Sequence, residues 1–454
     1  MNSMKWTLLA KPLAGLLCIL GCLTFAPGIV AAIENSPTTL IFFLTGLCAL
    51  LCGATCWYFL RNVEGEISNK MGFAVVTFSW IIACTYGALP FYFSGTLPYF
   101  LDAFFESASG FSGTGASVLT DIEAVDAGVL FWRSMTQWLG GMGIIVFFIA
   151  ILPLLGIGGV QLFRAEATGP QKDRITPRVR DTAKSLWLLY FGFTLLLTML
   201  LMFCGVSLYD SLNHAMTTMA TGGFSTKNLG AKGLNSIAAE YIIATFMLLG
   251  SISFSLHFRL LVLKDRKVFQ DTELRSYLAI VFGAIIVLTG VLWDYQFNSL
   301  EYAFRHAFFT ITATSSTTGF THSDYLGWPV FSHYIIILLM VMGGMSGSTA
   351  GGMKCIRLVA AFKLLSKELQ QVIHPNAVLT VKTNERSIRQ GVISAIWGFL
   401  FLYLFVFSVI SAVLVYEGLD LVTAATATFS ALSNVGPALG KLGPFDNYSA
   451  LSSI

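Results

Sequence analysis

The sequence predicts an all-α polytopic membrane protein. Of its 454 residues, 55% are hydrophobic and only 11% are charged, whereas a typical soluble domain is about 25% charged. Apolar runs long enough to cross a membrane recur along the whole chain, and shorter, more polar segments recur between them. These observations exclude a soluble enzyme with one anchor. They predict two N-terminal helices followed by four helix–short helix–helix repeats.

Nine apolar runs have the length of a transmembrane helix. The first, which follows Lys5 and Lys11, resembles a secretory signal. Its apolar stretch of about 20 residues is too long for a signal peptide, and a second run follows at once. We therefore expect a true first helix. The expected spans are 12–33, 37–60, 71–94, 127–155, 185–208, 238–263, 276–295, 330–350 and 391–416.

Four shorter segments are too short and polar to cross a membrane, yet too apolar for ordinary solvated loops. Bare backbone at membrane depth is tolerated only where protein or a water-filled cavity surrounds it. We therefore expect re-entrant units, each a short helix followed by a loop. The four segments are 101–118, 209–225, 300–321 and 419–438.

Positive charges are sorted to one side of this topology. The loops at 164–184, 264–275 and 354–389 are basic. If they share one side with the N-terminus, that side holds all but five of the 27 Lys and Arg residues, as expected for the cytoplasm. The short segments then enter from outside. The five exceptions are Arg133, Lys227, Lys232, Arg305 and Lys441.

The four short segments repeat one pattern, roughly a hundred residues apart. Each opens with an acid after a bulky residue, and this acid complements the positive end of a helix dipole. Each then closes on a glycine-centred phrase. The acids are Asp102, Asp210, Glu301 and Asp420, and the phrases are GTGAS (113–117), TGGFS (221–225), TTGFT (317–321) and NVGPA (434–438).

Such phrases suit a site for a monovalent cation. Four short helices entering from outside bring the negative ends of their dipoles to mid-membrane. Extended backbone after each helix can turn carbonyl oxygens toward one axis and replace the hydration shell of an ion. Glycine permits the backbone angles that this requires. The alternative is that the glycines only allow close helix packing, which accounts well for GGMGI at 140–144 but poorly for the four phrases.

These residues resemble the Trk/Ktr/HKT superfamily of potassium transporters, and most closely its bacterial TrkH/TrkG branch. The four glycine phrases carry the resemblance, together with LPLLGIGGVQLFRAE at 152–166 and KDRITPRVRDTAKSLW at 172–187. The resemblance covers nearly the whole chain. It implies potassium uptake through a pseudo-fourfold pore made by one chain, with no enzymatic activity.

The resemblance also implies the residues that bind potassium. Gly115, Gly223, Gly319 and Gly436 match the selectivity-filter glycines. Serine at the first position goes with sodium transport in the plant branch, so Gly115 favours potassium. Gly113 stands where the family commonly has a hydroxyl residue. The expected K⁺-binding residues are Gly113, Thr114, Gly115, Thr221, Gly222, Gly223, Thr317, Thr318, Gly319, Asn434, Val435 and Gly436.

A glycine-rich stretch, MGGMSGSTAGGMK at 342–354, interrupts the span that follows the third phrase. Glycines and hydroxyls there are expected to break the helix in mid-membrane. The matching family segment is an intramembrane loop that gates the filter, although a glycine-packed continuous helix is the alternative. The expected gating residues are Gly343, Gly344, Ser346, Gly347, Ser348, Thr349, Gly351 and Gly352.

Partners and location follow from the same resemblance. It implies a homodimer in the bacterial inner membrane, with the N-terminus cytoplasmic, and a cytosolic nucleotide-binding, TrkA-like regulatory subunit. The basic loops 164–184 and 354–389 are the expected docking surface. The expected cofactor is K⁺ in the pore, with no covalent group. Arg133 and Arg305 are expected to face protein and pair with anions, because a charge at the bilayer centre costs about 2.5–3.5 kcal/mol.

The fourth repeat departs from the others. Only 18 residues follow Gly436, too few for a second span. The arginine that the family carries in that helix therefore cannot be assigned. Either the chain is a shortened version of a longer one, which we favour, or the repeat is incomplete. The expected divisions are 1–66 (N-terminal helices), 67–163, 164–266 and 267–375 (repeats one to three) and 376–454 (repeat four without its second helix).

Two other classes compete with an ion-conducting pore. A secondary carrier of another small solute would have broken helices at its midplane, but such carriers have two-fold repeats rather than four like-oriented units. A membrane-embedded enzyme would need HExxH, GxSxG or paired intramembrane acids, and the sequence has none of these. The eight cysteines lack CxxC spacing and are expected to be unpaired core residues.

Overall fold

The computed structural model describes residues 6–63, 69–143, 179–376 and 390–451, with residues 380, 382–384 and 386–387 between the last two ranges. Within these ranges it is built from helices. Its strands are β1 (Lys382–Thr383) and β2 (Arg386–Ser387), which form one short antiparallel ladder. This architecture confirms the predicted all-α membrane fold. The eight cysteines form no disulfide, as expected, but the expectation that they are core residues is wrong for half of them, since Cys22, Cys48, Cys52 and Cys56 are exposed on the helices.

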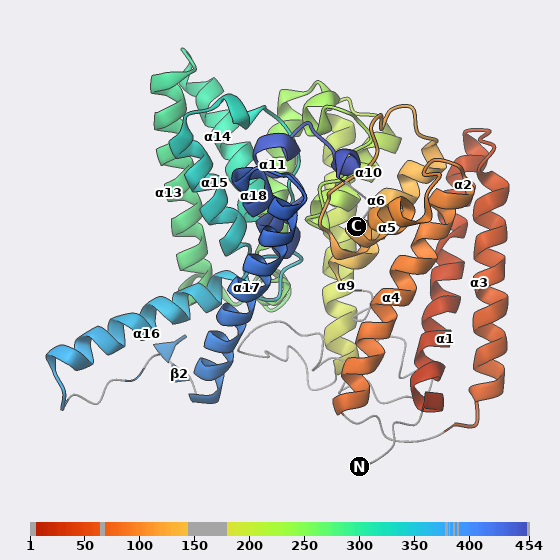
Figure 1. Ribbon diagram of the computed structural model, residues 1–454, viewed down its shortest axis with the longest axis horizontal. Helices are drawn as coiled ribbons and strands as arrows, with labels where there is room; N and C mark the ends of the chain where they lie inside the picture. The colour runs from red at the N-terminus through yellow and green to blue at the C-terminus, as the bar shows by residue number, and fades with distance from the viewer. Residues whose placement is uncertain are drawn as a thin grey trace.

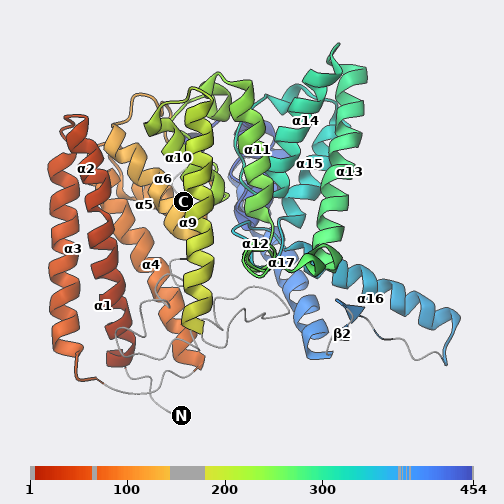
Figure 2. The ribbon, with the colours of Figure 1, turned by 180° about the vertical axis from the view of Figure 1, so that it is seen from behind.

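Six helical stretches in the described ranges are long and apolar enough to cross a membrane, and they run roughly alongside one another (Figures 1 and 2). Many of their large apolar side chains are exposed on the outer face of the bundle, as expected where lipid replaces water. They are α1 (Trp6–Leu23) continuing into α2 (Phe25–Ile33), α3 (Thr39–Leu60), α4 (Asn69–Phe93), α9 (Val179–Phe203), α13 (Thr272–Tyr295) and α17 (Gln390–Tyr416).

Four short helices occupy the four predicted re-entrant segments and lie in the upper half of the view in Figure 1. Their first turns explain why they begin where they do. Side-chain oxygens of Ser207, Ser299 and Asp420 accept the first free backbone N–H groups of three of them. The short helices are α5 (Phe100–Ser112), α10 (Leu208–Met219), α14 (Leu300–Ser315) and α18 (Leu421–Ser433).

The helices that follow the short ones differ from the expected spans. The span expected at 238–263 is broken into α11 (Ile237–Ser251) and α12 (Phe254–Leu261), which meet at 99° (Figure 2). The span expected at 330–350 ends early, as α15 (Val330–Met342). Of the span expected at 127–155, α6 (Ala127–Gly141) is described and residues 144–155 lie outside the described ranges.

The two breaks have a common physical cause. The N–H of Met345 donates to the carbonyl oxygen of Ser251 at 2.9 Å, and the N–H of Phe254 donates to that of Gly347 at 3.0 Å. Backbone groups released by the kink in one helix are therefore satisfied by the loop that interrupts the other. Neither break would be stable at membrane depth alone.

At the base of the molecule, α16 (Cys355–Ile373) projects away from the helical bundle (Figures 1 and 2). Lys363, Lys367 and Glu368 lie on this helix among exposed apolar side chains that include Phe362 and Leu369. It begins directly after the Gly343–Gly352 loop. The loop is thus continuous with an exposed element on the side predicted to be cytoplasmic.

Candidate functional site

The four short helices end with the same backbone motif. After each helix one residue adopts the left-handed conformation, with φ between 52° and 72°. The N–H of the next residue then donates to the carbonyl oxygen five residues earlier, at 2.9–3.0 Å. This is the hydrogen-bond pattern of a helix closed by a left-handed residue. The left-handed residues are Gly113, Thr221, Thr317 and Asn434.

Two residues further on, each chain segment has a glycine with φ between 69° and 95°, a conformation that disfavours any side chain. A Cβ atom on each glycine would lie closer than 3.0 Å to a carbonyl oxygen of the next repeat. The contacts run from Gly115 to Gly222, from Gly223 to Thr318, from Gly319 to Val435 and from Gly436 to Thr114.

These four contacts close on themselves in the order one, two, three, four, one. The loops 113–117, 221–225, 317–321 and 434–438, called here the glycine loops, therefore form a ring. One cavity of about 140 Å³ is lined by all four central glycines and extends toward Lys227 and Asp446. A ring of backbone at the end of four helices is an arrangement that can offer carbonyl oxygens to a cation.

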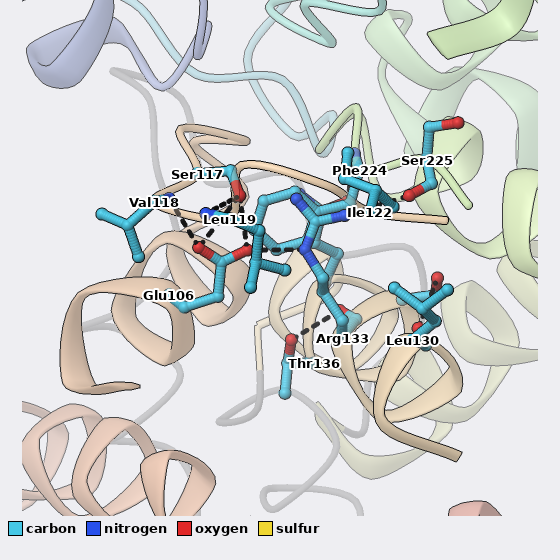
Figure 3. A network of polar contacts seen from close by, with 12 residues as sticks. Glu106, Ser117, Val118, Leu119, Ile122, Leu130, Arg133, Thr136, Phe224 and Ser225 are labelled. Atoms are coloured by element: carbon cyan, nitrogen blue, oxygen red, sulfur yellow. Dashed lines mark hydrogen bonds and ion pairs between the residues drawn. The ribbon is translucent and has the colours of Figure 1, made fainter. Parts of the chain in front are cut away.

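The first two glycine loops are joined by a buried ion pair (Figure 3). The Nε of Arg133 on α6 lies 2.6 Å from Oε1 of Glu106 on α5, and both side chains are at most 3% exposed. Arg133 also donates to the carbonyl oxygen of Ser225 at 3.1 Å. Glu106 accepts hydrogen bonds from the Ser117 hydroxyl and the Val118 N–H. The pair thus holds the C-terminal ends of both loops.

Gln137, one turn after Arg133, contacts the second glycine loop. Its Nε2 donates to the carbonyl oxygen of Gly222 at 2.6 Å, and its Oε1 accepts the N–H of Phe224 at 3.0 Å. The side chain is completely buried. One amide therefore spans Gly223 and fixes the peptide groups on both sides of it.

A different polar cluster lies behind the third glycine loop. Nε2 of His322 is 2.9 Å from Oε2 of Glu240 on α11, and Nη1 of Arg305 on α14 is 3.2 Å from the same oxygen. The N–H of Ala231 donates to the carbonyl oxygen of Thr321 at 3.1 Å. Arg133 and Arg305 both face protein and pair with acids, as predicted from their depth in the membrane.

Hydroxyl groups connect the fourth glycine loop to its neighbours. The Tyr325 hydroxyl donates to the carbonyl oxygen of Ala438 at 3.2 Å. The Tyr448 hydroxyl donates to that of Gly436 at 2.7 Å, and the Tyr448 N–H donates to that of Ser117 at 2.8 Å. In the loops themselves, the Thr114 hydroxyl donates to Oδ1 of Asn434 at 2.9 Å.

Outside the ring, Asp121 and Asn228 join the loops that follow the first two repeats' glycines. The Asn228 amide donates to Oδ1 of Asp121 at 2.8 Å. This hydrogen bond lowers the pKa of the Asp121 carboxyl from its ordinary value. The carboxylate therefore stays ionised, and a negative charge is fixed near the outer end of the cavity.

The Gly343–Gly352 loop has no helix between Met342 and Cys355, which confirms the predicted break and rules out a continuous helix there. It lies against the inner ends of three short helices. The Thr349 hydroxyl donates to the carbonyl oxygen of Met219 at 3.0 Å, and the Gly351 N–H donates to the Thr317 hydroxyl at 2.6 Å. A Cβ on Gly351 would meet the carbonyl oxygen of Ser433.

A buried acid on α13 holds both ends of this loop. Oε1 of Glu273 accepts the N–H of Ser346 at 2.7 Å and the N–H of Ile356 at 3.1 Å. Lys354 is also buried, and its Nζ donates to the carbonyl oxygen of Ala350. The loop is therefore fixed by specific polar contacts as well as by close glycine packing.

Sequence reasoning alone missed the residues that support the ring. Glu106 and Glu240 carried a usable signal, since acids within apolar segments need partners and Arg133 and Arg305 were already conspicuous. Glu273 follows a basic loop and had the appearance of a surface residue. Gln137 carried no signal beyond being polar in an apolar helix.

Comparison with known proteins places the fold in a family. The family model described as TrkH, "Cation transport protein", matches residues 39–451. The chain is 37% identical to the "Trk system potassium uptake protein TrkH" of Escherichia coli strain K12, over 97% of this chain and 92% of that protein. It is 32% identical to the "Trk system potassium uptake protein TrkG" of the same strain, over 91% of this chain and 86% of that one.

A solved structure has the same architecture. The crystal structure of the potassium transporter TrkH from Vibrio parahaemolyticus superposes with a TM-score of 0.87 and 32% sequence identity, covering 99% of this chain and 93% of that one. The chain therefore belongs to the TrkH family of cation transport proteins.

Proposed function

We propose that this chain takes up potassium across the bacterial inner membrane through the ring of glycine loops. The observation that carries the proposal is the closed cycle of contacts from each central glycine to a carbonyl oxygen of the next repeat. Four backbone segments of one geometry around a single axis can replace the hydration shell of a monovalent cation without a full charge. The relatives named for potassium uptake support the choice of ion.

In this proposal the residues of the ring form the selectivity filter. K⁺ is bound by backbone oxygens of Gly113–Gly115, Thr221–Gly223, Thr317–Gly319 and Asn434–Gly436. Support comes from the shared backbone motif, which places a left-handed residue and a left-handed glycine at equivalent positions in all four loops. Gly115 leaves no room for a side chain beside Gly222, which favours a uniform ring of carbonyls.

The Gly343–Gly352 loop is proposed to gate this filter from the inner side. Its contacts with the ends of α10 and α14 and with Ser433 support this role, because a loop in that position obstructs the exit from the ring. Glycines at both ends allow the loop to move with modest local cost. Opening would break the hydrogen bonds of Thr349 and Gly351.

Regulation is proposed to come from a cytosolic, nucleotide-binding, TrkA-like subunit that docks on the basic loops. The name "Trk system" of the relatives implies several components. The exposed helix α16 supports a docking surface, since it projects from the base and leads directly into the Gly343–Gly352 loop (Figure 1). We propose that the transporter works as a homodimer, with K⁺ in the pore as its only cofactor.

The competing function is a secondary carrier of another small solute. The break between α11 and α12 favours it, because carriers build midplane sites from discontinuous helices. The four equivalent glycine loops favour the filter, since a two-fold carrier does not need four of them.

Uptake of radioactive rubidium into proteoliposomes that contain the full chain tests the proposal. K⁺, Na⁺ and Cs⁺ are added as competitors, and wild type is compared with Gly115→Ser. We expect K⁺ to compete well and Na⁺ poorly, and we expect the substitution to reduce this difference, because a side chain at Gly115 displaces the Gly222 carbonyl.

The control is Gly192→Ala on α9, where an added Cβ meets no atom within 4 Å. This variant should retain wild-type uptake and selectivity. If wild type shows no cation flux, or if Gly115→Ser is active with unchanged selectivity, the glycines are packing residues and the carrier becomes the better hypothesis.

A further inference from the structure

The ring of glycine loops is not symmetric in its supporting contacts. The carbonyl oxygens that face the central glycines belong to Thr114, Gly222, Thr318 and Val435. Of these four, the Gly222 oxygen accepts a hydrogen bond from the side-chain amide of Gln137. In the part of the chain that the structure describes, no side-chain donor is found on the other three. One quadrant of the ring is therefore chemically distinct.

Gln137 reaches the ring itself and not only its outer support. Its Nε2 would lie 3.9 Å from a Cβ on Gly115, the residue that faces Gly222 across the repeat boundary. The same amide accepts the Phe224 N–H at 3.0 Å, so both peptide groups that flank Gly223 are fixed. The guanidinium of Arg133 lies 3.5 Å over the Phe224 ring and keeps that residue in place.

We propose that Gln137 is a positioning residue that sets cation selectivity in the second quadrant of the ring. Its amide holds the Gly222 carbonyl in one orientation and draws electron density from the oxygen, which makes this oxygen a weaker but better-placed ligand for a cation. Selectivity depends on the number and field strength of such carbonyl dipoles. The inference rests on the proposed function, since it assumes that the ring conducts potassium.

Two variants separate the hydrogen bonds from the shape of the side chain. Gln137→Met keeps length and burial but removes the donor and the acceptor. Gln137→Glu keeps the acceptor in both protonation states and the donor only when protonated. A protonated carboxyl can donate to the Gly222 oxygen and accept the Phe224 N–H, as glutamine does. An ionised carboxylate repels the Gly222 oxygen.

The matched control is Ser134→Ala on the same helix. Ser134 is buried, and its hydroxyl donates within the helix to the Leu130 carbonyl oxygen at 3.1 Å. Among the described residues, its hydroxyl has no hydrogen bond to a glycine loop. Loss of this hydroxyl should therefore change stability slightly and leave selectivity unchanged.

Rubidium uptake by the full chain in proteoliposomes, with K⁺ or Na⁺ as competitor, gives a selectivity ratio for each protein. We expect Gln137→Met to lower the ratio about tenfold, the factor that corresponds to loss of a buried hydrogen bond. A merely structural role would reduce the amount of folded protein or the maximal rate and leave this ratio unchanged. Unchanged selectivity in a folded, active Gln137→Met protein overturns the proposal.

Gln137→Glu keeps the test decisive if the methionine variant does not fold. The introduced carboxyl is protonated at low pH and ionised at high pH. The ratio should be near that of wild type at the acid end of the pH range tested and fall as pH rises and the carboxyl ionises. A flat profile at a reduced ratio, or a ratio equal to wild type throughout, overturns the proposal.

Wild type is measured at each pH as the control for the titration of neighbouring groups. Titratable groups on α6 and on elements in contact with α6 or the second glycine loop include Arg133 on α6, Glu106 on α5, His214 on α10 and Tyr190 on α9. All four are present in every variant, so only the difference from wild type is attributed to position 137. Wild type without potassium-selective uptake would refute the proposed function instead, and this role with it.

Discussion

Arg133 and Glu106 form a buried ion pair, 2.6 Å between Nε and Oε1, that fastens the C-terminal end of the first glycine loop to that of the second. The pair links α5 and α6 of one repeat to the loop of the next. Its burial makes it costly to break and therefore informative to test.

Glu106→Gln leaves the Arg133 guanidinium buried without its counter-charge. Breaking such a pair costs about 3–5 kcal/mol. We expect a large fall in thermal stability, measured as the melting temperature of the detergent-solubilised protein. The double variant Glu106→Leu with Arg133→Met should recover part of the loss, because neither charge remains.

The control for this pair is Lys227→Met, which removes a partly exposed ion pair with Asp210, 3.5 Å between Nζ and Oδ2. Exposed pairs contribute about 0–1 kcal/mol, so this variant should melt close to wild type. Equal stability losses in Lys227→Met and Glu106→Gln would show that burial does not determine the cost.

Gly319→Ala tests the closed ring in the third quadrant. Gly319 has φ 69°, and a Cβ there would meet the Val435 carbonyl oxygen. The left-handed conformation alone costs about 1–2 kcal/mol for alanine. We expect rubidium uptake to be lost. The matched control is Gly290→Ala on α13, where a Cβ meets no atom within 4 Å and uptake should persist. Full activity of Gly319→Ala would contradict the close approach of repeats three and four.

A disulfide between positions 253 and 347 tests whether the Gly343–Gly352 loop must move. A Cβ on Gly347 would lie 3.9 Å from that of Ser253, within the range of 3.5–4.5 Å that disulfides require. In a background without the native cysteines, Ser253→Cys with Gly347→Cys should show low uptake when oxidised and recovered uptake after reduction.

Each single cysteine variant serves as the control for that experiment, since neither can form the bridge. Gly347 has φ 77°, so its substitution also carries a conformational cost that the single variant measures. Normal uptake by the fully oxidised double variant would mean that uptake does not require the loop to separate from the α11–α12 break.

Glu273→Leu removes the acceptor of the Ser346 and Ile356 N–H groups at the two ends of the loop. Both N–H groups lose this acceptor, and loss of the acceptor of a buried N–H costs about 1–3 kcal/mol. We expect the closed loop to be destabilised and unstimulated rubidium uptake to rise. Glu301→Leu, at the exposed start of α14, is the control. A fall in uptake by Glu273→Leu with normal folding would indicate that the acid supports the open form.

The sequence was sufficient to locate the short helices and the glycine loops, because both depend on local composition. Asp102 or Glu301 at a helix start and Gly115 or Gly319 at its end are signals that one segment carries by itself. The broken helix in mid-membrane at Gly343 was predictable for the same reason.

The rest depends on contacts between distant segments. Residues 238–263 are uniformly apolar enough to suggest a straight span, and only the Gly343–Gly352 loop, far along the chain, stabilises the break after Ser251. The structural role of Gln137 likewise depends on its hydrogen bond to Gly222, 85 positions away. No pattern in a single sequence specifies such pairings.

The four boundaries between repeats are not fastened alike: an ion pair with an amide joins repeats one and two, a histidine–carboxylate cluster joins two and three, the Tyr325 hydroxyl joins three and four, and the Tyr448 N–H and the Thr114 hydroxyl join four and one. In a pore assembled from four identical subunits, every mutation would be present four times, and a single quadrant could not be changed alone. Here one codon alters one quarter of the proposed conduction path. If the ring is the pore that we propose, its ion preference can therefore be changed by mutation one quadrant at a time, while the other three quadrants are unaltered.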